Sequence, residues 1–523
     1  MKNKEIPFND TFQEAPNSFW LASTEITNYP SLYENIETEV AIIGGGIAGI
    51  TVASLLKREG LKVVLIEANR ITQGTTAHTT AKITSQHDLT YTTLVKKMGE
   101  EKARMYGESN QSAISLISDI IKENQISCDF SSRPAYIFTE DEEYLEKIKA
   151  EVKTAKNLGL PASFTETLQL PLNIKGAIRF DNQAQFHPRK YLLALAKSIP
   201  LNGSYIFENT RVLDIEQGKK LTLITNQNKK VTAEKVIICS HFPFYDGLGF
   251  YFTRIHTSRS YIIGIKTKEK IPDGMFKNAE NPTLSLRTQK YEDGEMLLIV
   301  GADHKTGENK DTTMHYTNLI NYAKETFKME KLLYRWSTQD CMTLDNVPYI
   351  GNLTSKTPNI YVATGFGKWG MTHGTLSAMI ISDLIVKGKS PYEELYSPSR
   401  FTPVASAENF VIQNLDVAKK FIGGKIAPVP NNVDIPIGNS KIIEAEAGKF
   451  GAYRDQEENL HLVNLTCTHM GCSPVWNSAE KSWDCPCHGS RFSYKGDILE
   501  GPAHEPLMQL HEGPNKVEPN IIP

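Results

Sequence analysis

The chain has 523 residues, more than one hydrophobic core ordinarily holds, so two or three domains are expected. Hydrophobic residues make up 40% and charged residues 22%, as in a soluble globular protein, and the net charge of -3 gives no basic surface for nucleic acid. No apolar run approaches the ~20 residues that a membrane span needs, and the polar start MKNKEIPFND lacks a signal-peptide core. These features predict a cytoplasmic protein, soluble or peripheral to a membrane, with no transmembrane segment.

The first 35 residues are predicted to form an arm that packs on the main domain. They contain the turn-rich stretch SFWLASTEITNYPSL, in which Trp20 is expected to be buried. No residue of this arm is typical of a catalytic site.

The segment from Val40 to Glu67 has the order strand, glycine-rich turn, helix, strand and acid. Gly44 allows a sharp turn, Gly46 lets backbone amides approach a pyrophosphate, and Gly49 lets the helix pack closely on the strand. The helix N-terminus adds partial positive charge for the phosphates. Glu67 suits a ribose 2'-hydroxyl and repels a 2'-phosphate, which argues against NADP. The sequence therefore predicts a dinucleotide-binding, Rossmann-like unit.

A loop of small residues follows, GTTAHTTAKIT at 74–84. Together with the preceding unit it resembles the glycine oxidase and D-amino-acid oxidase superfamily of FAD-dependent enzymes, in which such a loop passes along the flavin. The resemblance implies that Gly74, Thr75 and His78 bind FAD. In the dimethylglycine and sarcosine dehydrogenase branch, a similar histidine is bonded covalently to the flavin, whereas a loop histidine that only hydrogen-bonds is the alternative for His78. Lys82 is a candidate to face the flavin ring, where a cation favours anionic reduced flavin.

The middle of the chain alternates between helical and strand-like patterns. Apolar residues at helical spacing from Leu94 to Ile121 predict one or two helices over the sheet, and a charged helix is predicted near 141–158. Short alternating strands between Tyr205 and Cys239 predict an antiparallel layer that closes on the parallel sheet.

Residues 252–340 read as a second β-rich part, which in the superfamily forms the sheet over the flavin. Arg259, Tyr261 and Arg287 are the polar candidates for holding a substrate carboxylate, since arginine matches it bidentately. A solvated strand face would carry the same residue types, so that alternative stays open.

A second glycine-rich turn follows the strand at 360–363, and a helix is expected from about residue 372 to 386. The resemblance places Gly365, Gly370, Met371 and Thr372 at the flavin's pyrimidine edge, where backbone donors stabilise the negative charge of the reduced state. Two glycine-rich helix starts so far apart specify FAD better than NAD. Simple sarcosine oxidases carry a substrate-binding lysine where Thr372 stands, which puts small amino-acid substrates in doubt.

The last part of the chain carries two boxes, CTHMGC at 467–472 and CPCHGS at 485–490. They resemble those of a Rieske [2Fe-2S] domain, whose cluster needs two thiolates on one iron and two imidazoles on the other. The resemblance implies one iron on Cys467 and Cys485, the other on His469 and His488, and a disulfide between Cys472 and Cys487. Zinc is the alternative for such residues, but a zinc ribbon favours a Cys-x-x-Cys knuckle.

Neighbouring residues bear on the stability and potential of such a cluster. A disulfide in a cytoplasmic protein is expected to persist only if the cluster loops exclude thiols. Gly501-Pro502 resembles the proline-bearing loop over the cluster. Ser490 stands where high-potential Rieske proteins have a hydroxyl donor, whereas Phe492 replaces their tyrosine. One donor is therefore missing, which predicts a potential in the middle or lower part of the roughly -150 to +300 mV Rieske range.

The predicted fold is an α/β Rossmann-like FAD-binding domain with an interleaved antiparallel-sheet substrate domain, plus a small all-β C-terminal Rieske domain. The predicted domain boundaries follow from the resemblance, and proline and glycine residues mark the linker. It assigns 1–35 to the arm, 36–390 to the FAD-dependent oxidoreductase, 391–425 to the linker and 426–516 to the Rieske domain. Within the oxidoreductase, FAD parts are expected at about 36–95, 180–250 and 340–390, and substrate parts at about 96–180 and 251–340.

The combination resembles bacterial DadA-type FAD oxidoreductases with a C-terminal Rieske domain. It implies a dehydrogenase that takes hydride from a small amine or amino-acid-like CH-NH substrate onto FAD and passes single electrons through the cluster to an unidentified protein or quinone acceptor. The alternatives are an oxygen-using oxidase with the Rieske domain as redox sensor, and a non-catalytic electron-transfer or scaffold protein. An oxygenase would need a mononuclear iron site of two histidines and a carboxylate, for which the sequence offers no convincing set.

Overall fold

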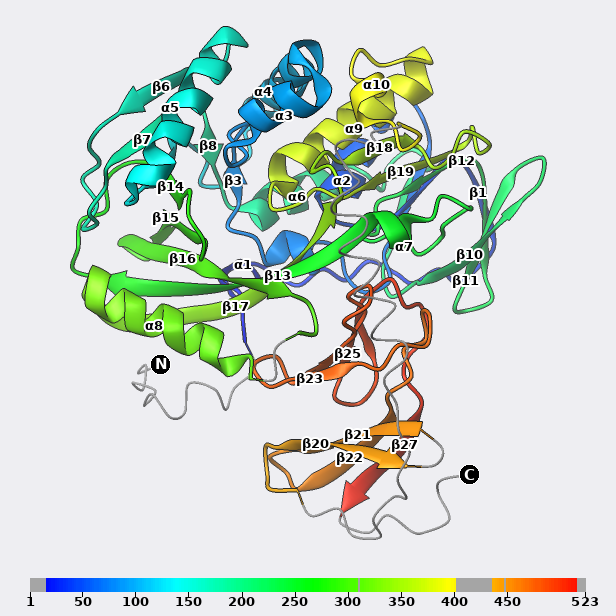
Figure 1. The fold of residues 1–523 in the computed structure, drawn as a ribbon. Helices are drawn as coiled ribbons and strands as arrows, with labels where there is room; N and C mark the ends of the chain where they lie inside the picture. The colour runs from blue at the N-terminus through cyan, green and yellow to red at the C-terminus, as the bar shows by residue number, and fades with distance from the viewer. Residues whose placement is uncertain (1–15, 309–310, 401–434, 446–447, 515–523) are drawn as a thin grey trace.

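The computed structural model describes residues 16–308, 311–400, 435–445 and 448–514 (Figure 1). Residues 1–15 of the predicted arm lie outside the described residues, as do 401–425 of the predicted linker and 426–434 of the predicted Rieske domain. Trp20 in the short helix α1 (Phe19–Ala22) is fully buried, as expected, and its indole Nε1 donates to Thr79 O at 2.7 Å.

The first sheet is built around the apolar strand that precedes the glycine-rich turn. Its main path runs β10 (Val212–Gln217), β11 (Leu221–Thr225), β12 (Lys230–Ile238), β1 (Ile36–Ile43), β2 (Val63–Ile66), β9 (Tyr205–Phe207). Alongside β12 lies β19 (Ile360–Thr364), which in turn pairs with β18 (Tyr349–Asn352). The pairs β1/β2, β1/β12, β12/β19 and β2/β9 are parallel, and their near-continuous apolar sequences suit strands buried on both faces.

Helices cover this sheet, and two of them begin at the glycine-rich turns. Helix α2 (Ile47–Arg58) packs against α9 (Gly370–Lys387), although the two lie more than 300 residues apart in sequence (Figure 1). The expected helical stretch at 94–121 forms α3 (Thr90–Met98) and α4 (Glu100–Glu123), which are separated at Gly99. Helix α6 (Pro188–Lys197) packs on α2, and α10 (Glu393–Tyr396) packs on β18. Helices α5 (Glu142–Asn157) and α7 (Tyr251–Arg254) contact strands of the second sheet.

The second sheet is the interleaved antiparallel layer that the sequence predicted. Its order is β17 (Met329–Thr343), β13 (Ile255–Thr267), β16 (Gly294–Lys305), β15 (Leu284–Tyr291), β14 (Met275–Asn278), β5 (Ala135–Thr139), β7 (Gly176–Phe180), β6 (Ala162–Thr165). Only the β14/β5 pair is parallel among these described strands. Helix α8 (Thr313–Phe327) packs on β13, β16 and β17. A small sheet of β3 (Lys82–Ile83), β8 (Ala184–Gln185) and β4 (Ser131–Ser132) lies between the two layers.

The last part of the chain forms two small antiparallel sheets with no helix among its described residues. One sheet is β20 (Ser440–Ala445), β21 (Gly448–Arg454), β22 (Asn459–Asn464), β27 (Gln509–Pro514). The other is β23 (Val475–Asn477), β24 (Ser482–Asp484), β25 (Arg491–Ser493), β26 (Ile498–Glu500), and it lies between the first one and the main body (Figure 1). The predicted fold class is confirmed.

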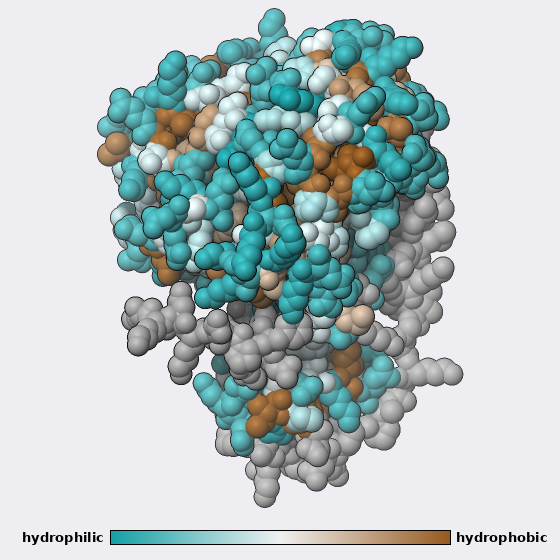
Figure 2. Space-filling view, turned by 90° about the vertical axis from the view of Figure 1, so that its left-hand side faces the viewer, coloured by the Kyte–Doolittle hydropathy of each residue, from teal (hydrophilic) through white to brown (hydrophobic). Residues whose placement is uncertain are grey.

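The face of the molecule in Figure 2 is mainly hydrophilic, with apolar residues gathered in separate small areas on both the main body and the smaller β part. Over the described ranges, no helix combines the length and the apolar character needed to cross a lipid bilayer.

Candidate functional site

A cavity of about 700 Å³ lies at the meeting point of the two large sheets and the smaller β part. Eight of the predicted FAD-binding residues line it: Gly44, Gly46, Glu67, Gly74, Thr75, His78, Gly370 and Met371. The predicted flavin-facing residue Lys82 also lines it. Gly49, Gly365 and Thr372 do not line the cavity. Their contacts shape the backbone next to it.

The first glycine-rich turn is shaped by two close backbone contacts. Gly44 has φ +107°, and a Cβ there would lie 2.5 Å from Cys239 O on the neighbouring strand. A Cβ on Gly49 would lie 1.9 Å from Gly44 O, so helix and turn can pack this closely only with glycine, as the sequence predicted. Across the turn, the Glu67 carboxylate accepts from the backbone amides of Gly45 at 2.8 Å and Asn69 at 2.9 Å, and burial raises its pKa.

The loop that the resemblance places along the flavin begins with a 3₁₀ turn, η2 (Thr75–Ala77), followed by His78. His78 Nδ1 lies 2.8 Å from Gly74 O, and because a carbonyl only accepts, Nδ1 carries the proton and Nε2 of the neutral ring is unprotonated. Burial lowers the pKa of His78, which favours the neutral ring. An unprotonated Nε2 suits both a covalent bond to flavin and a hydrogen bond, so both interpretations of His78 stay open.

The second glycine-rich turn leads directly into α9. Gly365 has φ +72° and packs against Thr343, and the helix begins at Gly370. Thr372 donates to Thr84 O at 3.0 Å, so its hydroxyl fixes α9 to the loop after β3. A lysine at this position would have to replace that buried contact.

The three predicted carboxylate-binding residues do not line the cavity. Ser260 and Ile262 line it, and since neighbouring strand residues point to opposite faces, Arg259 and Tyr261 project away from it. Arg259 contacts Ser337 and approaches Glu480 to 3.8 Å, and the Tyr261 hydroxyl lies 3.1 Å from His304 Nε2. Arg287 donates to the backbone oxygens of Thr80 at 2.8 Å and Ala81 at 3.0 Å. These arginines are buried structural groups rather than a solvated strand face, and their substrate role stays a prediction that these contacts do not support.

Other charged residues occupy the cavity wall instead. Among them are Lys82, Lys277, Lys368, Asp303 and Asp340. Lys368 Nζ lies 3.4 Å from Asp303 Oδ2, 3.5 Å from Asp340 Oδ2 and 2.7 Å from Ser260 Oγ. Lys82 Nζ donates to Phe276 O at 2.8 Å and contacts Ser285, and Lys277 contacts Asp88.

The three lysines differ in pKa because their surroundings differ. Burial, with Lys277 and Arg287 nearby, lowers the pKa of Lys82 well below its usual range. Burial and Lys368 lower the pKa of Lys277 to about 7, an effect that the Asp303 carboxylate opposes, and Lys277 also forms an ion pair with the half-exposed Asp88. Burial would also lower the pKa of Lys368, but Asp303 and Asp340 together raise it. Lys368 is therefore a cation held between two acids, whereas burial and neighbouring cations disfavour the charged forms of Lys82 and Lys277.

Sequence reasoning missed Lys277 and Lys368. Lys368 stands between two glycines of a helix-starting turn, GFGKWG, and a charge in such a turn is a usable signal. Lys277 lies in the short strand β14, which reaches the cavity only because β14 pairs with β5 from a distant part of the sequence. No local sequence pattern predicts that pairing.

The predicted cluster ligands come together on two loops of the smaller β part. The loop between β22 and β23 carries Cys467 and His469, and the loop between β24 and β25 carries Cys485 and His488. The Cys485 thiol donates to Cys467, which lowers the pKa of Cys467 to about 7 and raises the pKa of Cys485. The imidazole rings of His469 and His488 are 4.9 Å apart between centroids. The structure thus pairs sulfur with sulfur and imidazole with imidazole, as the resemblance implied.

Two observations show that this set fits a [2Fe-2S] cluster. His469 Nδ1 is buried without a hydrogen-bond partner among the described residues, as expected of a nitrogen that binds iron. The predicted disulfide between Cys472 and Cys487 is formed. Although the sulfurs of Cys472, Cys485 and Cys487 lie within 4.8 Å of one another, the disulfide removes two of them as thiolate ligands.

Ser490 lies between the cluster loops and the third loop, Gly501–Met508. Its hydroxyl donates to Cys467, and its Oγ accepts from Ala503 N at 3.0 Å. Phe492 is fully buried and has no hydroxyl to offer. The predicted single side-chain donor is therefore in place.

Replacing Ser490 by alanine should lower the midpoint potential of the cluster by about 60–130 mV, the one-electron equivalent of a charge-assisted hydrogen bond worth about 1.5–3 kcal/mol. The reason is that this donor stabilises the more negative, reduced cluster. A redox titration followed by electron paramagnetic resonance (EPR) measures the shift. Ser493→Ala, which removes a hydroxyl bonded to Asp497, is the control and should leave the potential unchanged. An unaltered potential in Ser490→Ala would contradict the assignment.

The cluster-bearing side of the smaller β part lies against the main body. The ring of Phe242 is 6.4 Å from that of His469, and the ring of Phe252 is 5.9 Å from that of His488. Farther from the cluster, Thr312 Oγ1 donates to Asn477 Oδ1 at 2.6 Å and accepts from Ala479 N at 2.9 Å. Glu480, Arg491 and the segment 498–504 line the large cavity, so both parts of the protein form its wall.

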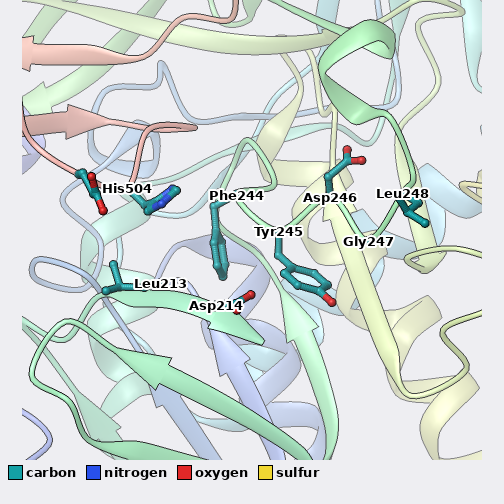
Figure 3. A pocket seen from close by; sticks show the side chains of 9 residues that line it. Leu213, Asp214, Phe244, Tyr245, Asp246, Gly247, Leu248 and His504 are labelled. Carbon is teal, nitrogen blue, oxygen red and sulfur yellow. The ribbon is translucent and has the colours of Figure 1, made fainter. Parts of the chain in front are cut away.

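A second, more open hollow of about 640 Å³ lies on the outer side of that wall (Figure 3). Figure 3 shows Phe244 between His504 on one side and Tyr245 on the other, with Leu213 and Asp214 below. Phe244 and His504 line both spaces, so they separate the hollow from the large cavity.

Two families match the chain. The family described as "FAD dependent oxidoreductase" matches residues 39–384, and the "Rieske [2Fe-2S] domain" matches residues 426–511. The chain is 43% identical over 499 residues to the Rieske 2Fe-2S iron-sulfur protein YhfW of Bacillus subtilis (strain 168), which covers 95% of this chain and 98% of that protein. It is 23% identical over 388 residues to the gamma-glutamylputrescine oxidoreductase of Escherichia coli (strain K12), which covers 71% of this chain and 89% of that protein.

Solved structures show the same fold for the main body. Glycine oxidase from Geobacillus kaustophilus superposes with a TM-score of 0.60 at 17% identity and covers 70% of this chain and 99% of that chain. L-proline dehydrogenase from P. horikoshii superposes with a TM-score of 0.58 at 19% identity and covers 70% of this chain and 98% of that chain. At these identities the similarity shows the fold alone.

Proposed function

Because the chain belongs to the FAD-dependent oxidoreductase family and carries a Rieske [2Fe-2S] domain, we propose that it is a dehydrogenase of a small CH-NH substrate that delivers single electrons to an external acceptor. Bound FAD supplies a two-electron acceptor for hydride, and the cluster supplies a one-electron carrier. The observation that supports this pairing is the shared cavity, which is lined by both glycine-rich turns and by Rieske residues 498–504. A two-electron and a one-electron centre that share a wall are suited to convert one kind of transfer into the other.

The charges of the cavity favour an amino-acid-like substrate. Lys277 and Lys82 offer ammonium groups to a carboxylate, while Asp303 and Asp340 offer carboxylates near a substrate amine. Lys368 neutralises part of the acidic charge and fixes both aspartates on one side. Substrate is therefore oriented by charge at both of its ends, which brings its CH-NH bond into a defined position.

Raising the pH from 6 to 8 should increase the KM for an anionic substrate roughly tenfold, because an ion-paired hydrogen bond worth about 1.5 kcal/mol is lost. The pKa of Lys277 is lowered to about 7, so the side chain is an ammonium below pH 7 and a neutral amine above it. The pH profile of KM for flavin reduction measures this change.

Two variants identify the group that titrates. Lys277→Met should raise KM at pH 6 and flatten the profile. Asp88→Asn should move the rise to lower pH, because the Asp88 carboxylate stabilises the Lys277 ammonium. A Lys277→Met protein with the wild-type profile would contradict this role.

The proposed function is tested by mixing anaerobic protein that holds both cofactors with a panel of amines and amino acids. Flavin absorbance and the EPR signal of the cluster are followed in parallel. Bleached flavin together with a reduced Rieske signal is the expected result. Bleached flavin with an oxidised cluster, and hydrogen peroxide once air is admitted, would instead establish the oxidase with a redox-sensing domain. If no member of the panel reduces the flavin, the result would favour a non-catalytic electron-transfer or scaffold protein.

A further inference from the structure

Strand β17 forms part of the cavity wall and also contacts the cluster loop. Ser337, Thr338 and Asp340 of β17 line the cavity, and Gln339 lies between them with only 1% of its surface exposed. On the cavity side, the Thr75 hydroxyl of the loop assigned to the flavin donates to Gln339 O across 3.4 Å. Gln339 itself does not line the cavity, but its backbone contacts a residue that does.

The side chain of Gln339 extends to the cluster loop. Its Nε2 donates to Gly489 O at 2.8 Å, and Gly489 follows the iron ligand His488 directly. Its Oε1 accepts from the buried Thr306 hydroxyl at 2.8 Å. Both ends of the amide are thus engaged, which fixes its orientation and its position.

The cluster loop rests on the main body through close backbone contacts at the same place. A Cβ on Gly489 would lie 2.3 Å from Thr257 Oγ1, and Gly489 has φ +80°. A Cβ on Gly307 of the main body would lie 2.7 Å from Pro486 Cα of the loop. The surfaces are complementary at the level of single atoms, and Gln339 supplies the side-chain hydrogen bond from the cavity wall to this loop.

We propose that Gln339 is the positioning residue that holds the cluster loop against the flavin cavity and provides the hydrogen-bonded connection for internal electron transfer. This inference rests on the proposed function. In that function two single-electron transfers reoxidise each two-electron-reduced flavin. Each converts one ferric iron of the cluster to ferrous iron, the acceptor removes an electron between them, and the flavin proton leaves to solvent. Gln339 keeps the two centres at a constant separation while this happens.

The test compares Gln339→Leu, which keeps the bulk but loses both hydrogen bonds, with Thr312→Val. Thr312 is 2% exposed, and its hydroxyl forms hydrogen bonds from the main body to Asn477, Ser478 and Ala479 of the Rieske domain, which lie away from the cluster ligands. In anaerobic protein that holds both cofactors, a light pulse in the presence of EDTA reduces FAD. Cluster reduction is then followed by absorbance and by EPR of frozen samples. FAD content and cluster potential are measured for each variant.

The expected result is that cluster reduction in Gln339→Leu slows by about tenfold at unchanged cluster potential, because a displacement of the order of 1 Å suffices for such a loss. Thr312→Val should stay within about twofold of wild type, since its bonds do not touch the cluster loop. In FAD-free protein, amide hydrogen exchange in residues 487–490 should also be faster in Gln339→Leu than in Thr312→Val.

Other outcomes separate the inference from the function on which it rests. Equal rates in Gln339→Leu and wild type would overturn the inference alone. Equal slowing in both variants would assign the effect to domain docking in general and would also overturn it. If the wild-type cluster is not reduced after its flavin, the proposed function fails and the inference falls with it.

Discussion

A protein in which Cys485 is replaced by serine should reduce its flavin with substrate as fast as wild type does, yet reduce cytochrome c on the order of 100-fold more slowly or not at all. Cys485 is buried, and its sulfur lies beside that of Cys467 at the centre of the cluster site. Serine offers a hard, poorly ionised oxygen in place of a soft thiolate, so the cluster is lost or altered. Anaerobic stopped-flow absorbance gives the first rate, and steady-state cytochrome c reduction gives the second.

Two further variants distinguish loss of the cluster from misfolding of the protein. Cys128→Ser changes a buried cysteine in the core of the main body and should leave both rates unchanged in any protein that folds. His469→Ala removes a half-buried predicted ligand of the other iron and should reproduce the loss in Cys485→Ser. If cytochrome c reduction survives without a cluster, electrons leave the flavin directly and the Rieske domain is not on the route.

The second large effect is expected on stability. Replacing Arg491 by methionine should lower the free energy of unfolding of the Rieske domain by about 3–5 kcal/mol, because it leaves buried acids without their cation. Arg491 Nε lies 3.0 Å from Asp484 Oδ1, and Nη1 lies 3.0 Å from Glu500 Oε1. Only 7% of the Arg491 side chain and 2% of the Asp484 side chain are exposed. Urea unfolding followed by the visible circular dichroism of the cluster measures the change.

The decrease in the free energy of unfolding caused by Arg491→Met should depend on pH. Burial would raise the pKa of Asp484 and of Glu500, but Arg491 holds both below their usual values. Such a pair stabilises the fold above the unfolded-state pKa of about 4 and loses that contribution as the pH falls through the lower folded-state pKa. The difference between wild type and Arg491→Met should therefore be full above about pH 5 and shrink below about pH 4.

A matched control removes an exposed cation from the same domain. Lys441→Met, at an exposed position of β20, should change the free energy of unfolding by no more than about 0.5 kcal/mol, as is usual for surface substitutions. A similar small change in Arg491→Met would contradict the stabilising role of the buried ion pairs.

The cluster site was predictable from the sequence because its ligands lie within two short loops, where residue spacing sets geometry. The resemblance of these two boxes to those of a Rieske domain implied the ligand pairs, the disulfide and the Ser490 donor. The glycine-rich turns were predictable for the same reason, since Gly44 and Gly49 meet across a single turn. The strand patterns, together with the resemblance to the superfamily, predicted the two large sheets.

The substrate side was not predictable because it depends on contacts between distant strands. Side chains alternate along β13, so Ser260 points toward the cavity and Arg259 away from it. The sequence alone does not indicate which of the two strand faces lines the cavity. Arg259 instead lies close to Glu480, a residue more than 200 positions later, in the interface between the main body and the Rieske domain. Lys277 and Gln339 likewise gain their positions from strand pairing and from that interface.

The Rieske segment 498–504 in the wall of the flavin cavity has a consequence for how the protein matures. FAD dissociates more slowly from a cavity whose wall is closed, so a docked Rieske domain retains the flavin. Because the ligand loops make the contacts that dock this domain, protein that lacks its cluster holds that wall less firmly. A cell short of iron would then accumulate protein that is also poor in flavin, and its iron supply would set the yield of both cofactors.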